Sequence, residues 1–123
     1  MIQNLKMYGP PIFYAVLILI ISSIPSLDLN TGFSYQDKVA HLLEYSIFGV
    51  LIQRALQYGK SGDFRWYLTG MGIGVIYGAF DEIHQIWVPG REAEIGDFAA
   101  DFAGFIIGQG LFFIQNRSRL FRR

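Results

Sequence analysis

Acidic side chains and both histidines of this chain fall inside or beside apolar runs long enough to cross a lipid bilayer. An ionisable group in the hydrocarbon layer costs roughly 2.5–3.5 kcal/mol on insertion scales, so each such group calls for a partner, a water-filled cavity or a function. A histidine near carboxylates suits general acid–base chemistry, and clustered carboxylates suit the binding of a hard cation. The groups concerned are Asp37, His41, Glu44, Asp81, Glu82, His84, Asp97 and Asp101.

The spacing of the first of these groups predicts one face of a helix. Asp37, His41 and Glu44 follow one another at intervals of four and three residues, with Tyr45 at the edge of the same stripe. His41 is the group best suited to exchange a proton near neutral pH. Asp37 would also serve as a helix N-cap, which leaves a purely structural interpretation open for it.

Two further stripes combine acids with small residues. Asp81 and Gln85 continue a glycine stripe in one apolar run, and Asp97 and Asp101 begin another in the next run. Small residues let membrane helices approach closely, so we expect these two glycine stripes to face each other. Capping alone is an alternative role for Asp97, and an interhelical hydrogen bond is one for Gln85.

The link between these two runs contains a turn signal, Pro89-Gly90, which would bring the two acidic stripes side by side. Arg91 follows the turn, and its guanidinium suits a carboxylate or phosphate ligand or an ion pair with Glu92 or Glu94. Glu82 is turned by about 100° from the Asp81 stripe, so it would face another helix or pair with Lys38 or Arg91.

Composition indicates a membrane protein with a single domain over residues 1–123. The chain is 52% hydrophobic and only 16% charged, against about 25% charged in an ordinary soluble domain. Pro10 and Pro11 suit the first turn of a helix. No cysteine is present, which excludes disulfides and thiolate chemistry. We predict an all-α bundle of four transmembrane helices over residues 9–27, 37–57, 66–88 and 97–115.

The distribution of basic residues predicts the orientation of this bundle. With four spans, eight of the ten cationic residues fall at one end and only Lys38 and Arg91 at the other. This bias places both termini in the cytoplasm and the acidic half on the extracytoplasmic side. The C-terminal arginines then anchor the chain to anionic lipid headgroups, and no nucleic-acid partner is expected. The eight are Lys6, Arg54, Lys60, Arg65, Arg117, Arg119, Arg122 and Arg123.

The ordered motifs of the chain resemble those of the VanZ-like family of small bacterial membrane proteins over roughly residues 10–114. The resemblance implies a multi-span protein of the bacterial inner membrane with an outward-facing polar cluster. The founding member of that family is linked to low-level resistance to the glycopeptide teicoplanin. Members often carry Asn where this chain has Asp101, which implies that a charge there is not required. The matching residues are Ser22-Ser23-Ile24-Pro25, Asp37-Lys38-Val39-Ala40-His41, Tyr45, Asp81-Glu82-Ile83-His84-Gln85, Pro89-Gly90-Arg91, Asp97, Ala100-Asp101 and Gly104.

Three functions are compatible with this pattern. The first is a module that binds a lipid headgroup, a lipid-linked cell-wall precursor or a glycopeptide, with low-level teicoplanin resistance as one consequence. The second is an enzyme in which His41 is the general acid or base and the neighbouring acids position it or hold Mg²⁺, Mn²⁺ or Ca²⁺. The third is a proton- or ion-coupled carrier, which would need to be an oligomer.

The candidate site residues follow from the stripes and the motifs. The sequence leaves open which ligand binds, whether a bond changes, whether a metal is used and what the oligomeric state is. The candidate catalytic residues are His41, Asp81 and Asp101, and the candidate ligand-binding residues are Asp37, Tyr45, Glu82, Gln85, Arg91 and Asp97.

Overall fold

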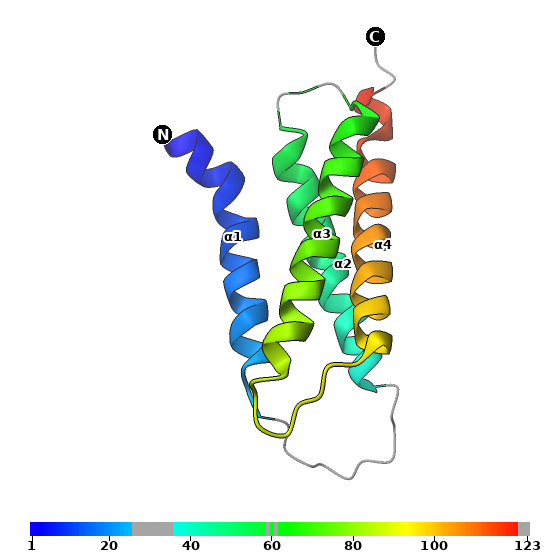
Figure 1. Ribbon diagram of the computed structural model, residues 1–123. Helices are drawn as coiled ribbons and strands as arrows, with labels where there is room; N and C mark the ends of the chain where they lie inside the picture. Colours follow the sequence, from blue (N-terminus) through cyan, green and yellow to red (C-terminus); the bar gives the residue numbers. More distant parts are fainter. Residues whose placement is uncertain (26–35, 59, 61, 121–123) are drawn as a thin grey trace.

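The computed structural model describes residues 1–25, 36–58, 60 and 62–120, and these residues form helices without any strand. The helices run side by side, and α1 begins and α4 ends at the end of the bundle where α2 is linked to α3 (Figure 1). The predicted all-α fold is therefore confirmed. The elements are α1 (Ile2–Ser22), α2 (Gln36–Leu56), α3 (Phe64–Gln85) and α4 (Ile95–Leu120).

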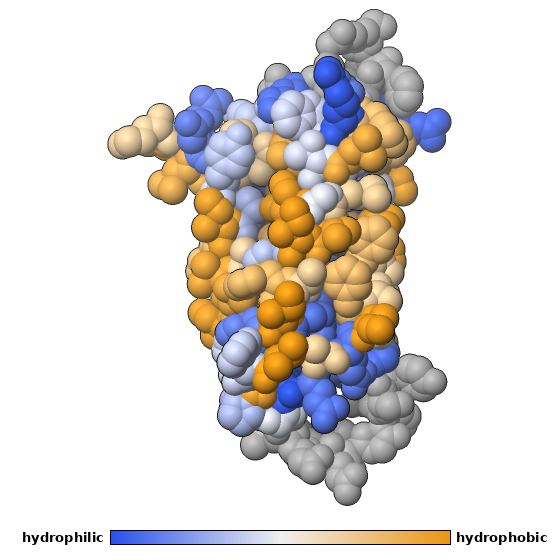
Figure 2. All heavy atoms as spheres, in the orientation of Figure 1, coloured by the Kyte–Doolittle hydropathy of each residue, from blue (hydrophilic) through white to orange (hydrophobic). Residues whose placement is uncertain are grey.

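The surface of the bundle carries an apolar belt. Figure 2 shows apolar residues around the middle of the visible face and hydrophilic residues toward both ends. Among the described residues, three segments are long and apolar enough to cross a membrane, namely Ile2–Ser22, Asp37–Leu56 and Ile95–Arg117. Helix α3 has a comparable length of 22 residues but carries more polar side chains near its C-terminal end. The chain is therefore a membrane-helical protein, and α3 also exposes large apolar side chains such as Ile76 and Phe80 on the outside of the bundle.

Helix α1 begins earlier than expected. The prediction that Pro10 and Pro11 occupy the first turn is wrong, because the helix starts at Ile2 and both prolines lie inside it. A membrane helix tolerates internal proline when neighbouring groups or local adjustments satisfy the freed backbone carbonyls. The N-terminal end of α1 leans away from the other helices (Figure 1). The part of the predicted first span beyond residue 25 lies outside the described residues.

Two tyrosine hydroxyls attach α1 to the bundle. Tyr14 donates a hydrogen bond to the backbone carbonyl of Glu44 at 3.1 Å, and Tyr77 donates one to the carbonyl of Ala15. The ring of Tyr14 stacks on that of Phe48 with centroids 6.2 Å apart. Because α1 buries few side chains of its own, these contacts supply much of its specific attachment to α2 and α3.

An aromatic core closes the centre of the bundle. Tyr45, Phe48 and Phe105 are almost completely buried and pack with Ile18. Phe48 is the hub of this group, since its ring centroid lies 5.0 Å from that of Tyr77, 5.7 Å from Phe105 and 6.0 Å from Tyr45. Tyr45 connects this aromatic core to the polar side chains of α2 and α3, because its hydroxyl bonds to Asp81.

The closest backbone approach joins α2 and α4, which corrects the expected partner of one glycine stripe. A Cβ added at Gly104 would lie 2.2 Å from the carbonyl oxygen of Leu42, and one at Gly108 would lie 2.0 Å from that of Ser46. Gly49 of α2 reciprocates, because its Cβ would lie 2.3 Å from the Phe105 oxygen. The prediction that the α4 glycines face α3 is wrong for these positions.

The glycines of α3 do face α4, but they contact side chains. A Cβ at Gly74 would lie 2.7 Å from the ring of Phe105, and one at Gly78 would lie 3.6 Å from the ring of Phe98. The predicted contact between α3 and α4 therefore exists, with aromatic rings from α4 filling the glycine groove. The sequence could not distinguish the two cases, because a stripe of small residues does not reveal which helix uses it.

Both ends of α3 have identifiable local causes. Asp63 caps its N-terminus by accepting a hydrogen bond from the Arg65 backbone N–H at 3.0 Å. This bond, with a second from the Arg65 side chain, holds the pKa of the Asp63 carboxyl below its usual value. At the other end, the helix stops at Gln85, and Gly90 adopts a positive φ of 74° in the predicted turn. That turn starts the return of the chain to α4.

Candidate functional site

A buried contact between a histidine of α2 and an aspartate of α4 forms the centre of the polar cluster. His41 Nδ1 lies 2.7 Å from Asp101 Oδ1, and both side chains are buried, with residue exposures of 6% and 1%. The two residues were predicted on separate stripes, and the close glycine-mediated approach of α2 and α4 brings those stripes together. The imidazole is therefore held in a fixed position by a carboxylate from a different helix.

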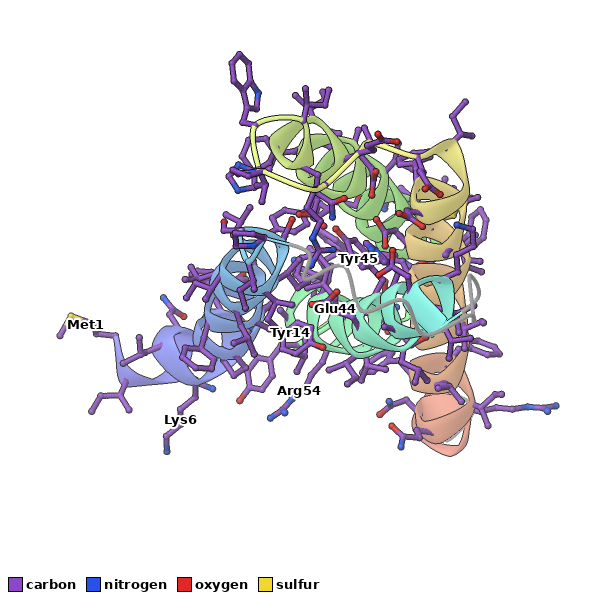
Figure 3. All side chains as sticks on the ribbon, turned by 90° about the horizontal axis from the view of Figure 1, so that it is seen from below. Met1, Lys6, Tyr14, Glu44, Tyr45 and Arg54 are labelled. Carbon is purple, nitrogen blue, oxygen red and sulfur yellow. The ribbon has the colours of Figure 1, made fainter. Side chains whose placement is uncertain are left out.

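Helix α3 adds a second carboxylate to this centre. Tyr45 donates a hydrogen bond to Asp81 Oδ2 at 3.1 Å, so the tyrosine hydroxyl fixes the orientation of the Asp81 carboxylate. Figure 3, which looks at the bundle from the end where α3 links to α4, shows Tyr45 among the helices and Glu44 nearer to α1. Tyr45 was placed at the edge of a sequence stripe, and in the structure it is fully buried at the contact between α2 and α3.

Within the part of the chain that the structure describes, three carboxylate oxygens of the cluster are buried without a hydrogen-bond partner. They are Asp81 Oδ1, Asp101 Oδ2 and Glu82 Oε1. A buried acceptor without a donor costs free energy, and an ionised one costs more. The unpaired oxygens therefore mark a place where a donor, a proton or a cation would be stabilising.

The outer edge of the cluster is neutralised in part by one lysine. Lys38 Nζ lies 2.9 Å from Glu94 Oε2 and 3.2 Å from Asp97 Oδ1. Asp97 is buried, whereas Asp37 is exposed and its Oδ1 lies 4.0 Å from His41 Nε2. Both aspartates fall in the first turn of their helices, so their positions remain compatible with favourable interaction at a helix N-terminus.

Glu82 faces the link between α3 and α4. Its Oε2 accepts a hydrogen bond from the Glu94 backbone N–H at 3.1 Å, and the side chain is buried. In the structure, Lys38 bonds with Glu94 and Asp97 rather than with Glu82, the partner that the sequence had suggested. Glu82 thus ties the incoming segment of α4 to α3 while its second oxygen stays unpaired.

Gln85, His84 and Arg91 contact α1 instead of the carboxylates. Gln85 Nε2 donates to Ser22 Oγ at 3.4 Å, and Arg91 Nε donates to the carbonyl of Ile24 at 3.2 Å. His84 Nε2 lies 2.8 Å from Ser23 Oγ. The Ser22-Ser23-Ile24 segment therefore receives three polar contacts at the end of α1. Neither of the ion pairs considered for Arg91 is its bond in the structure, since Glu94 pairs with Lys38.

The arrangement permits proton exchange and cation binding. Two sets of three residues bring one possible ligand atom from each member within 4.8 Å of the others. The sets are His41, Asp81 and Asp101, and Asp37, His41 and Asp97. His41 belongs to both sets. Imidazole and carboxylate ligands are common to several divalent metals, so the residues present could hold an ion as well as an ammonium group.

A second buried polar group, which no sequence motif had singled out, lies in the opposite half of the bundle. Gln109 Nε2 donates to Gln53 Oε1 at 2.8 Å and to the Tyr67 carbonyl at 3.0 Å. Gly70 makes room for these amides, because a Cβ there would lie 2.5 Å from Gln109 Nε2. The available signal was the presence of glutamines inside apolar runs, because such amides hydrogen-bond across membrane helices. The pairing of Lys38 with Glu94 and Asp97 was not predicted either, although Lys38 directly precedes the apolar run of α2.

Comparison with known proteins assigns the chain to a family. Searches among curated proteins and among solved structures gave no match. The family model described as VanZ/LLP1 matches residues 11–116, which is most of the chain and includes every residue of the polar cluster. The chain therefore belongs to the VanZ/LLP1 family.

Proposed function

We propose that this protein binds a cell-envelope component or a glycopeptide at the polar cluster, through a group of the ligand that is positively charged or donates hydrogen bonds. The observation that carries the proposal is the set of unpaired buried oxygens on Asp81, Glu82 and Asp101. Acceptors in this position match ammonium, amide or hydroxyl groups of a ligand. Ligand pockets place a few polar groups of this kind among apolar and aromatic side chains, as Tyr45 and Phe48 are placed here.

The charge of the cluster supports a cationic ligand group. Lys38 is bonded to Glu94 and Asp97, and the bond that Arg91 makes is to a backbone carbonyl near α1. The deeper carboxylates of Asp81 and Asp101 face His41 as the nearest group that can be positive. An ammonium group would add the charge that these acids lack, at a depth where water screens charges weakly.

The proposed location of this cluster is the extracytoplasmic half of a bacterial inner membrane. The described cations Lys6, Arg54 and Lys60 lie toward the end where α1 begins, opposite the polar cluster, and basic residues favour the cytoplasmic side. A reporter that works only in the cytoplasm should be active when it is fused after Arg123. A reporter that works only outside the cytoplasm should be active when it is inserted in the 28–35 segment. The opposite pattern would overturn the orientation and the outward-facing site together.

Direct ligand binding tests the proposal. We expect the protein in lipid nanodiscs to bind teicoplanin or an amine-bearing lipid-linked cell-wall precursor. Asp81→Asn and Asp101→Asn should weaken binding by about tenfold or more, because a charge-assisted hydrogen bond contributes roughly 1.5–3 kcal/mol. Glu92→Gln removes an exposed charge from the same end of the bundle and serves as the matched control. Equal affinity in all variants, or no binding of either probe, would contradict the proposal.

A second candidate function is catalysis, which the His41–Asp101 contact favours. A carboxylate 2.7 Å from an imidazole nitrogen orients the ring and stabilises its protonated form. In that case the protein would act on a lipid-linked envelope substrate, with His41 moving the proton. Turnover of purified lipid-linked precursors that disappears in His41→Gln would favour this function over simple binding.

A further inference from the structure

We propose that His41, Asp81 and Asp101 form a binding site for a divalent first-row metal ion at the meeting point of α2, α3 and α4. This inference rests on the proposed function: an ion here would supply the positive charge that the acids lack, in place of an ammonium group, and would leave an open position for a hydroxyl group of the ligand. One donor atom from each residue lies within 4.8 Å of the others. Two atoms bound to one tetrahedral ion at about 2.0–2.2 Å lie about 3.3–3.6 Å apart, so the donor atoms would draw together by up to about 1.5 Å on binding.

The bonding within the set leaves one oxygen of each aspartate free, while Nδ1 of His41 is engaged by Asp101. Asp101 Oδ1 contacts His41, whereas Asp101 Oδ2 has no partner. Asp81 Oδ2 accepts the Tyr45 hydroxyl, whereas Asp81 Oδ1 has none. Both aspartates are 1% exposed, so bulk water does not solvate these oxygens. Each acid therefore has one oxygen held in place by the protein and a second one available to an ion.

Neighbouring residues hold the three proposed ligands in position, as they do in known metal sites. Metal-binding carboxylates and imidazoles are held by hydrogen bonds from neighbouring residues, and Tyr45 does this for Asp81. The three ligands come from three helices, and tight packing at Gly104 fixes the distance between α2 and α4. Three protein ligands are the number that catalytic zinc sites use, with a further position left for water or substrate.

The chemistry of the donors narrows the ion. Carboxylates suit Mg²⁺, Ca²⁺ or Mn²⁺, whereas the imidazole of His41 suits Zn²⁺ and related transition metals, so Zn²⁺ and Mn²⁺ are the ions chosen for this mixed set. The outer set of Asp37, His41 and Asp97 competes for the same imidazole. It is the weaker candidate, because Asp37 is exposed and Asp97 already bonds with Lys38. The inner set is therefore the one assigned to the ion.

Metal titration of the untagged full chain tests this site without any envelope ligand. After treatment with a chelator, the detergent-solubilised protein should bind one Zn²⁺ or Mn²⁺ ion per chain. Titration calorimetry measures the binding of either ion, and loss of the electron paramagnetic resonance signal of free Mn²⁺ measures the binding of Mn²⁺. Asp81→Asn and Asp101→Asn should each weaken binding by more than about tenfold. Glu92→Gln, which removes an exposed carboxylate at the same end of the bundle, should bind as the unchanged chain does. Helical circular dichroism identifies any variant that fails to fold, and His41→Gln replaces it as the test variant.

The outcomes separate this inference from the proposed function. Failure to bind either ion, or equal binding by the Asp81→Asn and unchanged chains, overturns the metal site. Loss of binding in Asp37→Asn with retention in Asp81→Asn also overturns it, because the outer set would then hold the ion. Envelope-ligand binding that persists after chelation would leave the proposed function standing alone. Metal binding without affinity for either envelope probe would support the ion site and reject the proposed function.

Discussion

Gly108→Leu should abolish the close packing of α2 and α4 and cause a large loss of stability in this protein. A side chain at residue 108 meets the carbonyl oxygen of Ser46 at 2.0 Å and the backbone nitrogen of Val50 at 3.0 Å. Backbone atoms cannot rotate away as a side chain can, so the helices must separate. We expect a cost at or above the upper end of the ~1–3 kcal/mol that overpacking usually causes. Thermal unfolding in detergent measures this loss.

Gly110→Leu is the matched control for this prediction. It lies on the same helix two residues further on, and a Cβ there meets nothing within 4 Å. Since leucine is a better helix former than glycine, this variant should keep or slightly raise the unfolding temperature. Gly104→Leu should behave like Gly108→Leu, because its Cβ would also contact α2 backbone. If Gly108→Leu unfolds at the same temperature as Gly110→Leu, the assigned contact between α2 and α4 is wrong.

His41→Leu should give the second large effect, because it leaves the buried Asp101 carboxylate without its partner. Breaking one side of a buried ion pair typically costs about 3–5 kcal/mol. His41→Gln should lose less, since its amide can still donate a hydrogen bond to Asp101 Oδ1. The double variant His41→Leu/Asp101→Leu removes both polar partners and should recover part of the loss. Unfolding of the unchanged chain, His41→Leu, Asp101→Leu and the double variant in detergent gives the coupling free energy of the pair.

The same variants distinguish the candidate functions. A binding module should keep most of its affinity in His41→Gln and lose it in His41→Leu, because the amide preserves size and hydrogen bonding. An enzyme or proton relay should lose activity in both variants, since glutamine cannot transfer a proton. A coupling free energy near zero, together with full function in both single variants, would mean that His41 and Asp101 do not form the centre of the site.

Much of this arrangement could be read from local sequence patterns. Helical periodicity and apolar length predicted the helices, and the spacing of Asp37 and His41 predicted a polar stripe on α2. Asp81 and Asp101 stood out because carboxylates are costly at those depths. The Pro89-Gly90 turn indicated that α3 and α4 would return side by side. These features depend on chain geometry and solvent transfer, which act on each segment separately.

Partner choice between the helices required the tertiary structure. Gly104 lies against the α2 backbone, whereas Gly74 leaves room for the Phe105 ring. In the sequence both glycines belong to stripes of the same kind. Arg91 bonds to the Ile24 carbonyl, while Lys38 pairs with Glu94, one of the two acids considered for the arginine. In each case several partners had suitable chemistry, and the sequence carries no distance between helices.

The sequence by itself therefore determined that this chain is a bundle of apolar helices with an acidic half containing His41. Only the tertiary structure decided that His41 bonds to Asp101, that Tyr45 holds Asp81, and that one oxygen of each acid stays unpaired. The physical reason is that helical period sets which residues share a face, whereas the rotation and separation of each helix depend on side-chain volume across the whole bundle. A single absent Cβ at Gly104 or Gly108 sets the separation of α2 and α4, and with it the geometry of the site.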